Sequence, residues 1–284
     1  MCGRYVSTSP PDELAKYFGA APPEALLPEN YNVAPSQDVY AVVEERPRRT
    51  GDEAEPGTDR APGADEASGP GAEDGDGPAA EGEAVRRLEA FHWGLVPMWA
   101  KDTKVGYRMI NARAETIARK NAYRTAFKRR RCILPADGFY EWKVVGTDER
   151  GKPRKQPFFI HRTDGEPLAM AGVWERWLGP DKDQAEALHS VAVVTTEANE
   201  FMSQIHDRMP VFLPPSEWEQ WLDPDIDDTE ALQRLLVPAP EGLLTAHPVD
   251  PKVGNVRNRG PELIDVYDAG EGTLGDGTLG AGEG

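Results

Sequence analysis

The stretch Cys132-Ile133-Leu134-Pro135-Ala136-Asp137-Gly138-Phe139-Tyr140-Glu141-Trp142-Lys143-Val144-Val145 decides the fold class of this chain. It contains two runs of β type, at 132–134 and 138–145, that follow one another without a helix. Similar runs occur at 39–44, 88–96, 157–161, 168–174 and 190–196. Helical patterns are fewer, and occur at 121–130, 216–222 and 228–236. Because strands outnumber helices and do not alternate with them, the sequence predicts an α+β fold in one compact domain.

A short helix is expected near the N-terminus. The stretch Ser9-Pro10-Pro11-Asp12-Glu13 offers a capping hydroxyl, prolines for the first turn and acids at the positive end of the helix dipole. Leu14, Tyr17 and Phe18 share one helical face, and Gly19 supplies the stop.

The acidity of the chain is concentrated in two segments. Its 284 residues carry a net charge of −17, but residues 51–85 hold eleven acids and one base, and residues 268–284 hold four acids and no base. Residues from about 46 to 86 contain almost no large apolar side chain, so we expect a disordered insertion between two strands. We expect a disordered tail at 268–284 and one folded domain over 2–267, which is nearly neutral and can carry a basic face.

Two cysteines, Cys2 and Cys132, are too few for a disulfide framework and lack metal-ligand spacing. The N-terminus shows no signal peptide, and no apolar stretch is long enough to span a membrane. We therefore expect a cytoplasmic protein without metal or cofactor. Nothing in the sequence requires more than a monomer.

Cys2 is the most informative position, because removal of Met1 leaves an amine and a thiol on one residue. An α-amine has an ordinary pKa of about 7.7–8.0, so a useful fraction is neutral and nucleophilic at neutral pH. The amine can condense with an aldehyde to an imine, and the thiol can then close a thiazolidine ring by an intramolecular step. A ring-opened abasic deoxyribose presents such an aldehyde. Taken alone, however, a cysteine at position 2 is more often incidental.

Two stretches combine aromatic or polar side chains in a way that suits a DNA site. Phe91-His92-Trp93-Gly94-Leu95-Val96-Pro97-Met98-Trp99 gathers aromatics that suit stacking on an unpaired base, although a core strand with buried tryptophans is an equal alternative. Ile110-Asn111-Ala112-Arg113-Ala114-Glu115-Thr116 places an amide, a guanidinium and a carboxylate together. A helix start with a surface salt bridge would explain the second stretch as well.

Two further stretches contain acid–base groups. Glu141 lies between aromatics on an apparently buried strand, where an acid is unfavourable unless it is paired. His206, beside Asp207 and Arg208, is the residue type that ordinarily titrates near neutral pH. Structural roles are the alternative for both. Together, Cys, His, Asn and Glu resemble an acid–base constellation around an N-terminal nucleophile. No metalloprotease, hydrolase-elbow or nucleotide-cofactor motif is present.

The order of these motifs resembles the SOS response-associated peptidase (SRAP) family. The resemblance rests on Met-Cys-Gly-Arg-Tyr at 1–5, Tyr-Asn-Val-Ala-Pro at 31–35, Trp-Gly-Leu-Val-Pro at 93–97, Asn-Ala-Arg-Ala-Glu-Thr at 111–116, Asp-Gly-Phe-Tyr-Glu-Trp at 137–142 and Ile-His-Asp-Arg-Met-Pro at 205–210. His-Pro-Val at 247–249 and Val-Gly-Asn-Val at 253–256 match the C-terminal end of the family pattern.

The resemblance implies a single α+β domain around a distorted mixed β-barrel with flanking helices. It also implies covalent cross-linking of Cys2 to abasic sites in single-stranded DNA. Asn111 would hold the Cys2 amine and the ring, Glu141 would help move protons, and His206 would promote opening of the deoxyribose. The implied contacts to DNA phosphates and flanking nucleotides are Arg4, Pro35, Trp93, Trp99, Arg113 and Arg208.

Other activities stay open at this stage. Strand cleavage as an abasic-site lyase is a side activity of the same chemistry. A cysteine peptidase that removes Met1 or cleaves a partner needs the Cys2 thiol but not the amine, and a non-covalent reader of damaged DNA needs neither. Basic residues at 129–131 and 152–155 would widen a positive face, and a DNA-bound protein would associate with the nucleoid. We expect the acidic insertion to lie away from the DNA groove, because its charge opposes phosphate.

Overall fold

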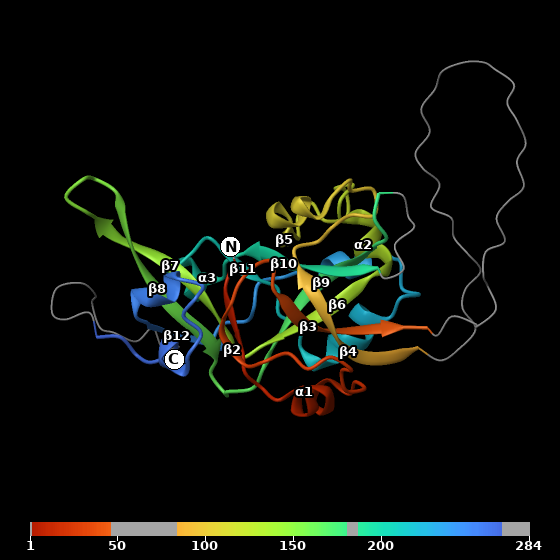
Figure 1. The fold of residues 1–284 in the computed structure, drawn as a ribbon, viewed down its shortest axis with the longest axis horizontal. Helices are drawn as coiled ribbons and strands as arrows, with labels where there is room; N and C mark the ends of the chain where they lie inside the picture. The colour runs from red at the N-terminus through yellow and green to blue at the C-terminus, as the bar shows by residue number, and fades with distance from the viewer. Residues whose placement is uncertain (1, 47–83, 181–186, 269–284) are drawn as a thin grey trace, which may run out of the picture.

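Two β-sheets organise the chain in this computed structural model, which describes residues 2–46, 84–180 and 187–268 (Figure 1). The smaller sheet is antiparallel throughout. Its strands, in spatial order, are β12 (Leu244–Pro248), β8 (Pro153–Arg162), β7 (Gly138–Thr147), β1 (Tyr5–Ser7) and β2 (Asn30–Val33).

The larger sheet is mixed, because β10 pairs in parallel with β4 and β5 and antiparallel with β9 and β11. Its strands are β11 (Arg208–Pro210), β10 (Leu188–Glu197), β4 (Val85–Trp93), β3 (Asp38–Glu45), β6 (Arg131–Ala136), β9 (Leu168–Trp177) and β5 (Asn111–Arg113). Since β9 also pairs with β10, the path β10-β4-β3-β6-β9 closes on itself into a distorted ring.

Short helices flank these sheets, so the predicted α+β class in a single domain with mixed strands is confirmed. The α-helices are α1 (Pro11–Phe18), α2 (Arg124–Arg129), α3 (Glu200–Ser203), α4 (Trp218–Leu222) and α5 (Thr229–Arg234). The 3₁₀ helices are η1 (Thr103–Arg108), η2 (Pro215–Glu217), η3 (Pro251–Gly254) and η4 (Pro261–Leu263). Within the described residues, no helix has the length and apolar character needed to cross a membrane.

Two large apolar clusters fill the interior. One joins α1, α2, α4 and α5 to the larger sheet, and it includes the fully buried Phe127 and Trp221. The other lies between the two sheets and includes Cys2, Trp93 and Phe139. A smaller cluster covers the opposite face of the smaller sheet and contains Tyr140 and Phe159. The N-terminal cysteine therefore lies within the core between the sheets rather than on a free chain end.

The helix expected near the N-terminus is present, but its cap differs from the prediction. α1 buries Leu14 and Phe18, and Gly19 ends it in the left-handed conformation at φ 62°. The residue at the cap position is Pro10, which offers no side-chain hydrogen bond. The Ser9 hydroxyl donates instead to Asp137, just before β7. This bond joins the start of the helix to the residue that precedes β7 in the smaller sheet.

The insertion predicted at about 46–86 falls mostly on residues 47–83, which lie outside the described residues, as do 269–284 of the predicted tail. The flanking strands β3 and β4 pair as an antiparallel hairpin, with Glu45 opposite Val85. β4 therefore begins at Val85, earlier than the predicted start at residue 88. Arg86, which the sequence placed in the insertion, pairs with Glu44 across the hairpin.

Candidate active site

Cys2 is held in place by the strand that follows it. β1 pairs with β7 in the register Tyr5 opposite Phe139, and the Tyr140 N–H donates to the Arg4 carbonyl at 3.0 Å. This register runs the first residues of the chain alongside the part of β7 that carries Glu141. The Cys2 side chain is fully buried. The pairing of β1 with β7 thus brings a residue at the start of the chain close to an acid far along the sequence.

Asn111 contacts Cys2 directly. Its Nδ2 donates to the Cys2 carbonyl oxygen at 2.8 Å. β5 fixes the Asn111 backbone by parallel pairing with Val193 of β10, and the Tyr123 hydroxyl donates to the Asn111 carbonyl at 3.1 Å. The side-chain oxygen of Asn111 is buried and has no hydrogen-bond partner among the described residues. An acceptor is therefore available beside Cys2.

Glu141 is an acid whose charge acts on the Cys2 thiol. It lies on β7 and its side chain is 3% exposed. Burial raises the pKa of the Cys2 thiol well above its ordinary value, and the charge of Glu141 adds to the increase. The thiol is accordingly held in its protonated form at neutral pH. The position of Glu141 between aromatics predicts a buried acid, and the structure confirms its burial.

His206 follows α3, next to the same apolar cluster that contains Cys2, since Ile205 and Met209 belong to that cluster. Its Nδ1 accepts the Arg208 N–H at 3.0 Å and lies 2.9 Å from a carboxylate oxygen of Asp207. Nδ1 can accept from Arg208 only when it is unprotonated, whereas a protonated Nδ1 donates to Asp207. The two contacts therefore correspond to Nδ1 without a proton and to Nδ1 with a proton, and a neutral ring that accepts from Arg208 carries its proton on Nε2.

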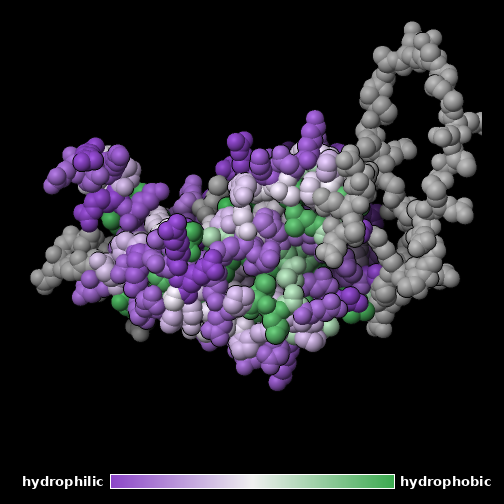
Figure 2. All heavy atoms as spheres, viewed as in Figure 1, coloured by the Kyte–Doolittle hydropathy of each residue, from purple (hydrophilic) through white to green (hydrophobic). Residues whose placement is uncertain are grey.

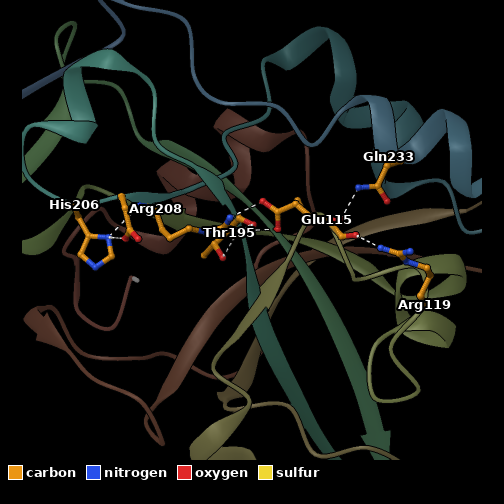
Figure 3. Close-up of polar contacts among 8 residues, drawn as sticks. Glu115, Arg119, Thr195, His206, Arg208 and Gln233 are labelled. Atoms are coloured by element: carbon orange, nitrogen blue, oxygen red, sulfur yellow. Dashed lines mark hydrogen bonds and ion pairs between the residues drawn. The ribbon is translucent and has the colours of Figure 1, made fainter.

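Arg208 lies beside His206 in a row of polar contacts (Figure 3). It binds Glu115 through two parallel contacts, Nη1 to Oε1 at 2.5 Å and Nη2 to Oε2 at 3.1 Å, and it donates to the Thr195 carbonyl at 2.7 Å. The Glu115 carbonyl then accepts from Arg119 at 3.1 Å. The surface salt bridge considered for the 110–116 stretch is present, with Arg208 rather than a neighbouring residue as its partner.

The other expected phosphate contacts differ in exposure. Arg113 is exposed at the end of β5. Arg4 directs its guanidinium to the C-terminal segment, donating to Asn32 and to the Val253 carbonyl at 2.9 Å each and to the Gly254 carbonyl at 3.2 Å. The Arg4 side chain thus joins β1 to η3, which explains why the C-terminal motif at 253–256 accompanies the N-terminal one.

The tryptophans of the 91–99 stretch have opposite environments. Trp93 is fully buried, donates through Nε1 to the Ile110 carbonyl at 3.1 Å and packs against Tyr5. A nucleotide cannot reach it in this structure, so the expectation of a DNA contact at Trp93 is corrected to a core role. Trp99 is 64% exposed, beyond the end of β4. Pro35 is half-buried in the turn before β3.

Of the basic residues at 129–131, two are engaged inside the protein rather than on a positive face. Arg131 is buried and donates to the Phe127 carbonyl at 3.0 Å and the Trp221 carbonyl at 2.5 Å. Arg130 pairs with the buried Glu175 at 2.6 Å. The C-terminal ends of α2 and α4 leave carbonyls without partners inside the helix, and Arg131 donates to them. The sequence did not indicate this tertiary contact.

Two side chains in the site were missed by sequence reasoning. The Tyr5 hydroxyl is fully buried next to Cys2 and has no hydrogen-bond partner among the described residues. Burial is the main cause that raises the Tyr5 pKa. Tyr123, which positions Asn111, carries no sequence signal, because its contact depends on how α2 packs. Across the described residues, no group of three or more His, Cys, Asp or Glu side chains has the arrangement of a metal site.

A family model and a bacterial relative each match nearly the whole chain. The family model described as SOS response associated peptidase (SRAP) matches residues 1–256. The chain is 35% identical over 268 residues to the abasic site processing protein YoaM of Bacillus subtilis (strain 168), covering 94% of this chain and 98% of YoaM. It is 36% identical over 184 residues to the abasic site processing protein YedK of Escherichia coli (strain K12), covering 62% of this chain and 74% of YedK.

The chain is also similar in sequence to an animal protein and in fold to a solved structure. The abasic site processing protein HMCES of Xenopus tropicalis is 32% identical over 200 residues, which cover 63% of this chain and 57% of HMCES. The crystal structure of a protein from Bacteroides thetaiotaomicron superposes with a TM-score of 0.70 at 22% identity, covering 94% of this chain and 100% of that one. At this identity the structural likeness supports the fold alone.

Proposed function

Because the chain belongs to the SOS response associated peptidase (SRAP) family, we propose that it processes abasic sites by capturing them covalently in single-stranded DNA. The attacking group is the α-amine of Cys2 after Met1 is removed, and the thiol of the same residue completes the link. Relatives named abasic site processing proteins support the substrate. The contact between Asn111 and Cys2 supports the site.

That contact is the observation that carries the proposal. A side chain from β5 donates to the carbonyl of Cys2 at 2.8 Å, and its unpartnered oxygen lies in the same buried place. Such an amide fixes the backbone of residue 2 and presents an acceptor for an N–H group near it. An amine that forms a covalent bond gains most from being held in one orientation, because misplacement by about 1 Å can lower a rate roughly 100-fold.

The first step joins the Cys2 amine to the aldehyde carbon of the opened deoxyribose. The nitrogen forms a bond to carbon, the carbonyl oxygen leaves as water, and an imine remains. The amine must be unprotonated to attack, and we assign the role of accepting its proton to Glu141, which is buried and whose charge acts on Cys2. Asn111 holds the nitrogen through the side-chain oxygen during this step.

The second step adds the thiol across the imine. Sulfur bonds to the former aldehyde carbon, and the thiol proton ends on the ring nitrogen, so the thiazolidine forms without an oxidant or reductant. Burial and Glu141 raise the pKa of the thiol, which favours a protonated thiol that reacts after the amine. A peptidase would instead need an activated thiolate as its first nucleophile. The same environment disfavours the thiolate that the peptidase alternative requires.

His206 is proposed to open the sugar. The closed deoxyribose releases its aldehyde when a general acid protonates the ring oxygen, and a histidine is suited to donate a proton near neutral pH. With Nδ1 occupied by the Arg208 N–H or by Asp207, Nε2 is the atom that would face the sugar. The same group can return the proton when the link reverses.

DNA would be held on the surface around this pocket. Arg113 and Arg208 are proposed to bind phosphates, and the exposed Trp99 and the half-buried Pro35 to meet nucleotides beside the lesion. Arg4, whose guanidinium holds the C-terminal segment, would help by fixing β1 and hence Cys2. Base stacking on an exposed aromatic contributes about 1–3 kcal/mol per base, and Trp99 is the member of this set that would provide it.

A denaturing gel tests the proposal. Protein with Met1 removal confirmed by mass spectrometry is mixed with single-stranded DNA that carries one abasic site. The matched variants are Cys2→Ser, which keeps the amine without the thiol, and a form that retains Met1. The native protein should give a heat-resistant shifted band without any reductant. Cys2→Ser should give a stable band only when borohydride traps the imine, and the Met1-retaining form should give none.

Each alternative predicts a different pattern. A band from the Met1-retaining form would mean that the thiol or a lysine attacks first, and capture by the Cys2 amine would be rejected. Absence of any stable band, together with equally tight binding by Cys2→Ala, would favour a non-covalent reader of damaged DNA. Peptide cleavage that survives blocking of the amine would favour the peptidase.

A further inference from the structure

Strands β7 and β8 extend beyond the body of the molecule as a hairpin arm, which we define as residues 143–155 (Figure 1). The arm holds five basic and two acidic residues in a chain whose net charge is −17. Nearly all of its side chains are exposed or half-buried, and Figure 2 shows the projecting end as a hydrophilic surface. A positively charged projection from an acidic protein indicates a negatively charged partner.

The register of the hairpin decides which way its basic side chains face. Phe139 pairs with Ile160, and Glu141 with Phe158, so these four share one face of the smaller sheet. Phe139, Phe158 and Ile160 belong to the cluster that contains Cys2. The alternate residues, Tyr140 and Phe159, pack in the separate cluster on the opposite side. The face that carries Glu141 is therefore the face of the active site.

On the arm, the face that carries Glu141 continues with basic residues. Lys143 comes two residues after Glu141, and its partner in the register is Gln156. Arg154 comes two residues before Gln156 on β8, where the strand alternates without a break. A bulge between Val144 and Gly146 lies on β7 alone and does not change the direction of Arg154. Lys155, next to Arg154, projects from the other face.

The charges of this face are available to a partner. Lys143 and Arg154 form no ion pair with any residue in the described part of the chain. The same holds for Lys155 on the other face. The acid Asp148, at the tip, accepts from the backbone N–H groups of Arg150 and Lys152 at 2.9 and 2.8 Å, which holds its carboxylate against the turn. The tip acid thus stabilises the hairpin instead of pairing with the basic side chains.

We propose that the Lys143–Arg154 face of the arm binds phosphates of the DNA strand that leaves the active site on one side of the lesion. The lesion itself comes from the proposed function, on which this inference rests. On β8, which has no bulge, Arg154 lies four positions from Phe158, the partner of Glu141, or about 13 Å along the arm. At a spacing of about 3.4 Å per nucleotide for a stacked strand, the arm reaches roughly four nucleotides from the abasic site.

The binding test compares neighbouring residues on opposite faces. Arg154→Gln and Lys155→Gln each remove one charge from the same strand, and both are measured in a Cys2→Ala background with intact single-stranded DNA over a salt series. We expect Arg154→Gln to weaken binding about threefold to tenfold and to lower the salt slope by about 0.7, the value for one lost phosphate contact on a single strand. Lys155→Gln should change both quantities much less.

A double variant tests the whole face. Lys143→Gln with Arg154→Gln is compared with Lys16→Gln and Arg87→Gln, two exposed residues on α1 and β4 that lie away from the arm. The first pair should lose about twice the salt slope of Arg154→Gln alone, and the second pair should match the parent. Equal effects of the two pairs, or of Arg154→Gln and Lys155→Gln, would overturn the proposal, because they would show net charge acting without a defined face.

Flank length provides a readout that depends on capture. The abasic site is placed in strands whose 5′ or 3′ flank is shortened to two nucleotides. Capture by the native protein should slow when one particular flank is short, and the Lys143–Arg154 double variant should show no such difference. A difference that persists in the variant would reject the arm as its source. Failure of all capture would reject the proposed function instead, while the binding comparison would still test the arm.

Discussion

Arg208 and Glu115 form a two-point ion pair in which both nitrogens at the end of the guanidinium meet both carboxylate oxygens. The two residues are 93 positions apart, and the pair joins β11 to the segment that follows β5. The Arg208 guanidinium also donates to the Thr195 carbonyl. A carboxylate in this geometry occupies the place that a phosphate would take, since Arg binds both groups through the same parallel contacts.

Glu115→Gln should therefore strengthen binding to single-stranded DNA. The amide keeps the shape of Glu115 but removes the charge that competes with phosphate, so we expect affinity to rise about threefold to tenfold at low salt and the salt slope to steepen. Fluorescence anisotropy at several salt concentrations measures both. Loss of stability should stay within about 1 kcal/mol because the Glu115 side chain is largely solvated. Weaker binding by the variant would instead identify Glu115 as the residue that orients Arg208.

The contact from Asn111 to the Cys2 carbonyl predicts a strong effect of Asn111→Asp. The new carboxylate cannot donate to the Cys2 carbonyl, and two acceptor oxygens then face each other, so the capture rate should fall about 10- to 100-fold. Single-turnover gels measure the rate, and thermal unfolding checks that the variant folds. Tyr123→Phe removes the hydroxyl that fixes the Asn111 backbone and should give a smaller decrease. A native rate for Asn111→Asp would exclude the proposed positioning role.

Tyr5→Phe should stabilise the protein. The Tyr5 hydroxyl is buried without a partner among the described residues, and such a group destabilises a fold by about 1–3 kcal/mol. Urea unfolding should therefore show a higher free energy of unfolding in the variant, and the capture rate should stay within about twofold of native. A tenfold slower capture would show instead that the hydroxyl takes part in the reaction at Cys2.

Because of His189, we expect the free energy of unfolding to decrease in mild acid. Its ring stacks on Phe91 and contacts Trp174. Burial lowers the His189 pKa below its ordinary value of 6.5, Glu45 opposes this change, and Arg176 adds to it. As the pH falls below 6.5 the unfolded chain takes up a proton that the folded ring resists, so the free energy of unfolding decreases until the folded pKa is reached.

Above pH 6.5 both states of His189 are neutral and the effect disappears. His189→Phe keeps an aromatic ring in the stack and removes the titration. Its unfolding free energy, measured by urea at a series of pH values, should therefore fall less steeply in this window than that of the native protein. Parallel curves for the two proteins would show that other groups cause the acid sensitivity.

Much of the fold could be predicted from local patterns. The runs at 138–145 and 157–161 became β7 and β8, and the helical pattern at 228–236 became α5. Alternation, helix signals and turn residues act within a few positions of one another, so a single sequence contains them. The shifted boundaries, such as the start of β4 at Val85, come from pairing with a partner strand that lengthens a run beyond its apolar residues.

The site was predictable only in part. The sequence identified Cys2, Asn111, Glu141 and His206 by residue type and by family motif, and the structure brings Asn111 to Cys2 and the charge of Glu141 to the thiol. The chemical roles of these four residues stay predictions. The structure corrected Trp93 and the arginines at 130 and 131, because a tryptophan or an arginine in a motif looks the same whether it faces the core or the solvent.

The sequence by itself determined the α+β class, the acidic segments and the presence of a cysteine at position 2, since these depend on composition and on local periodicity. Tertiary structure alone decided that Arg208 pairs with Glu115, that Arg4 binds the C-terminal segment, and that the basic face of the arm continues the face of Glu141. Such contacts join residues far apart in the chain. Their geometry depends on strand register and packing, which a one-residue shift in pairing would reverse.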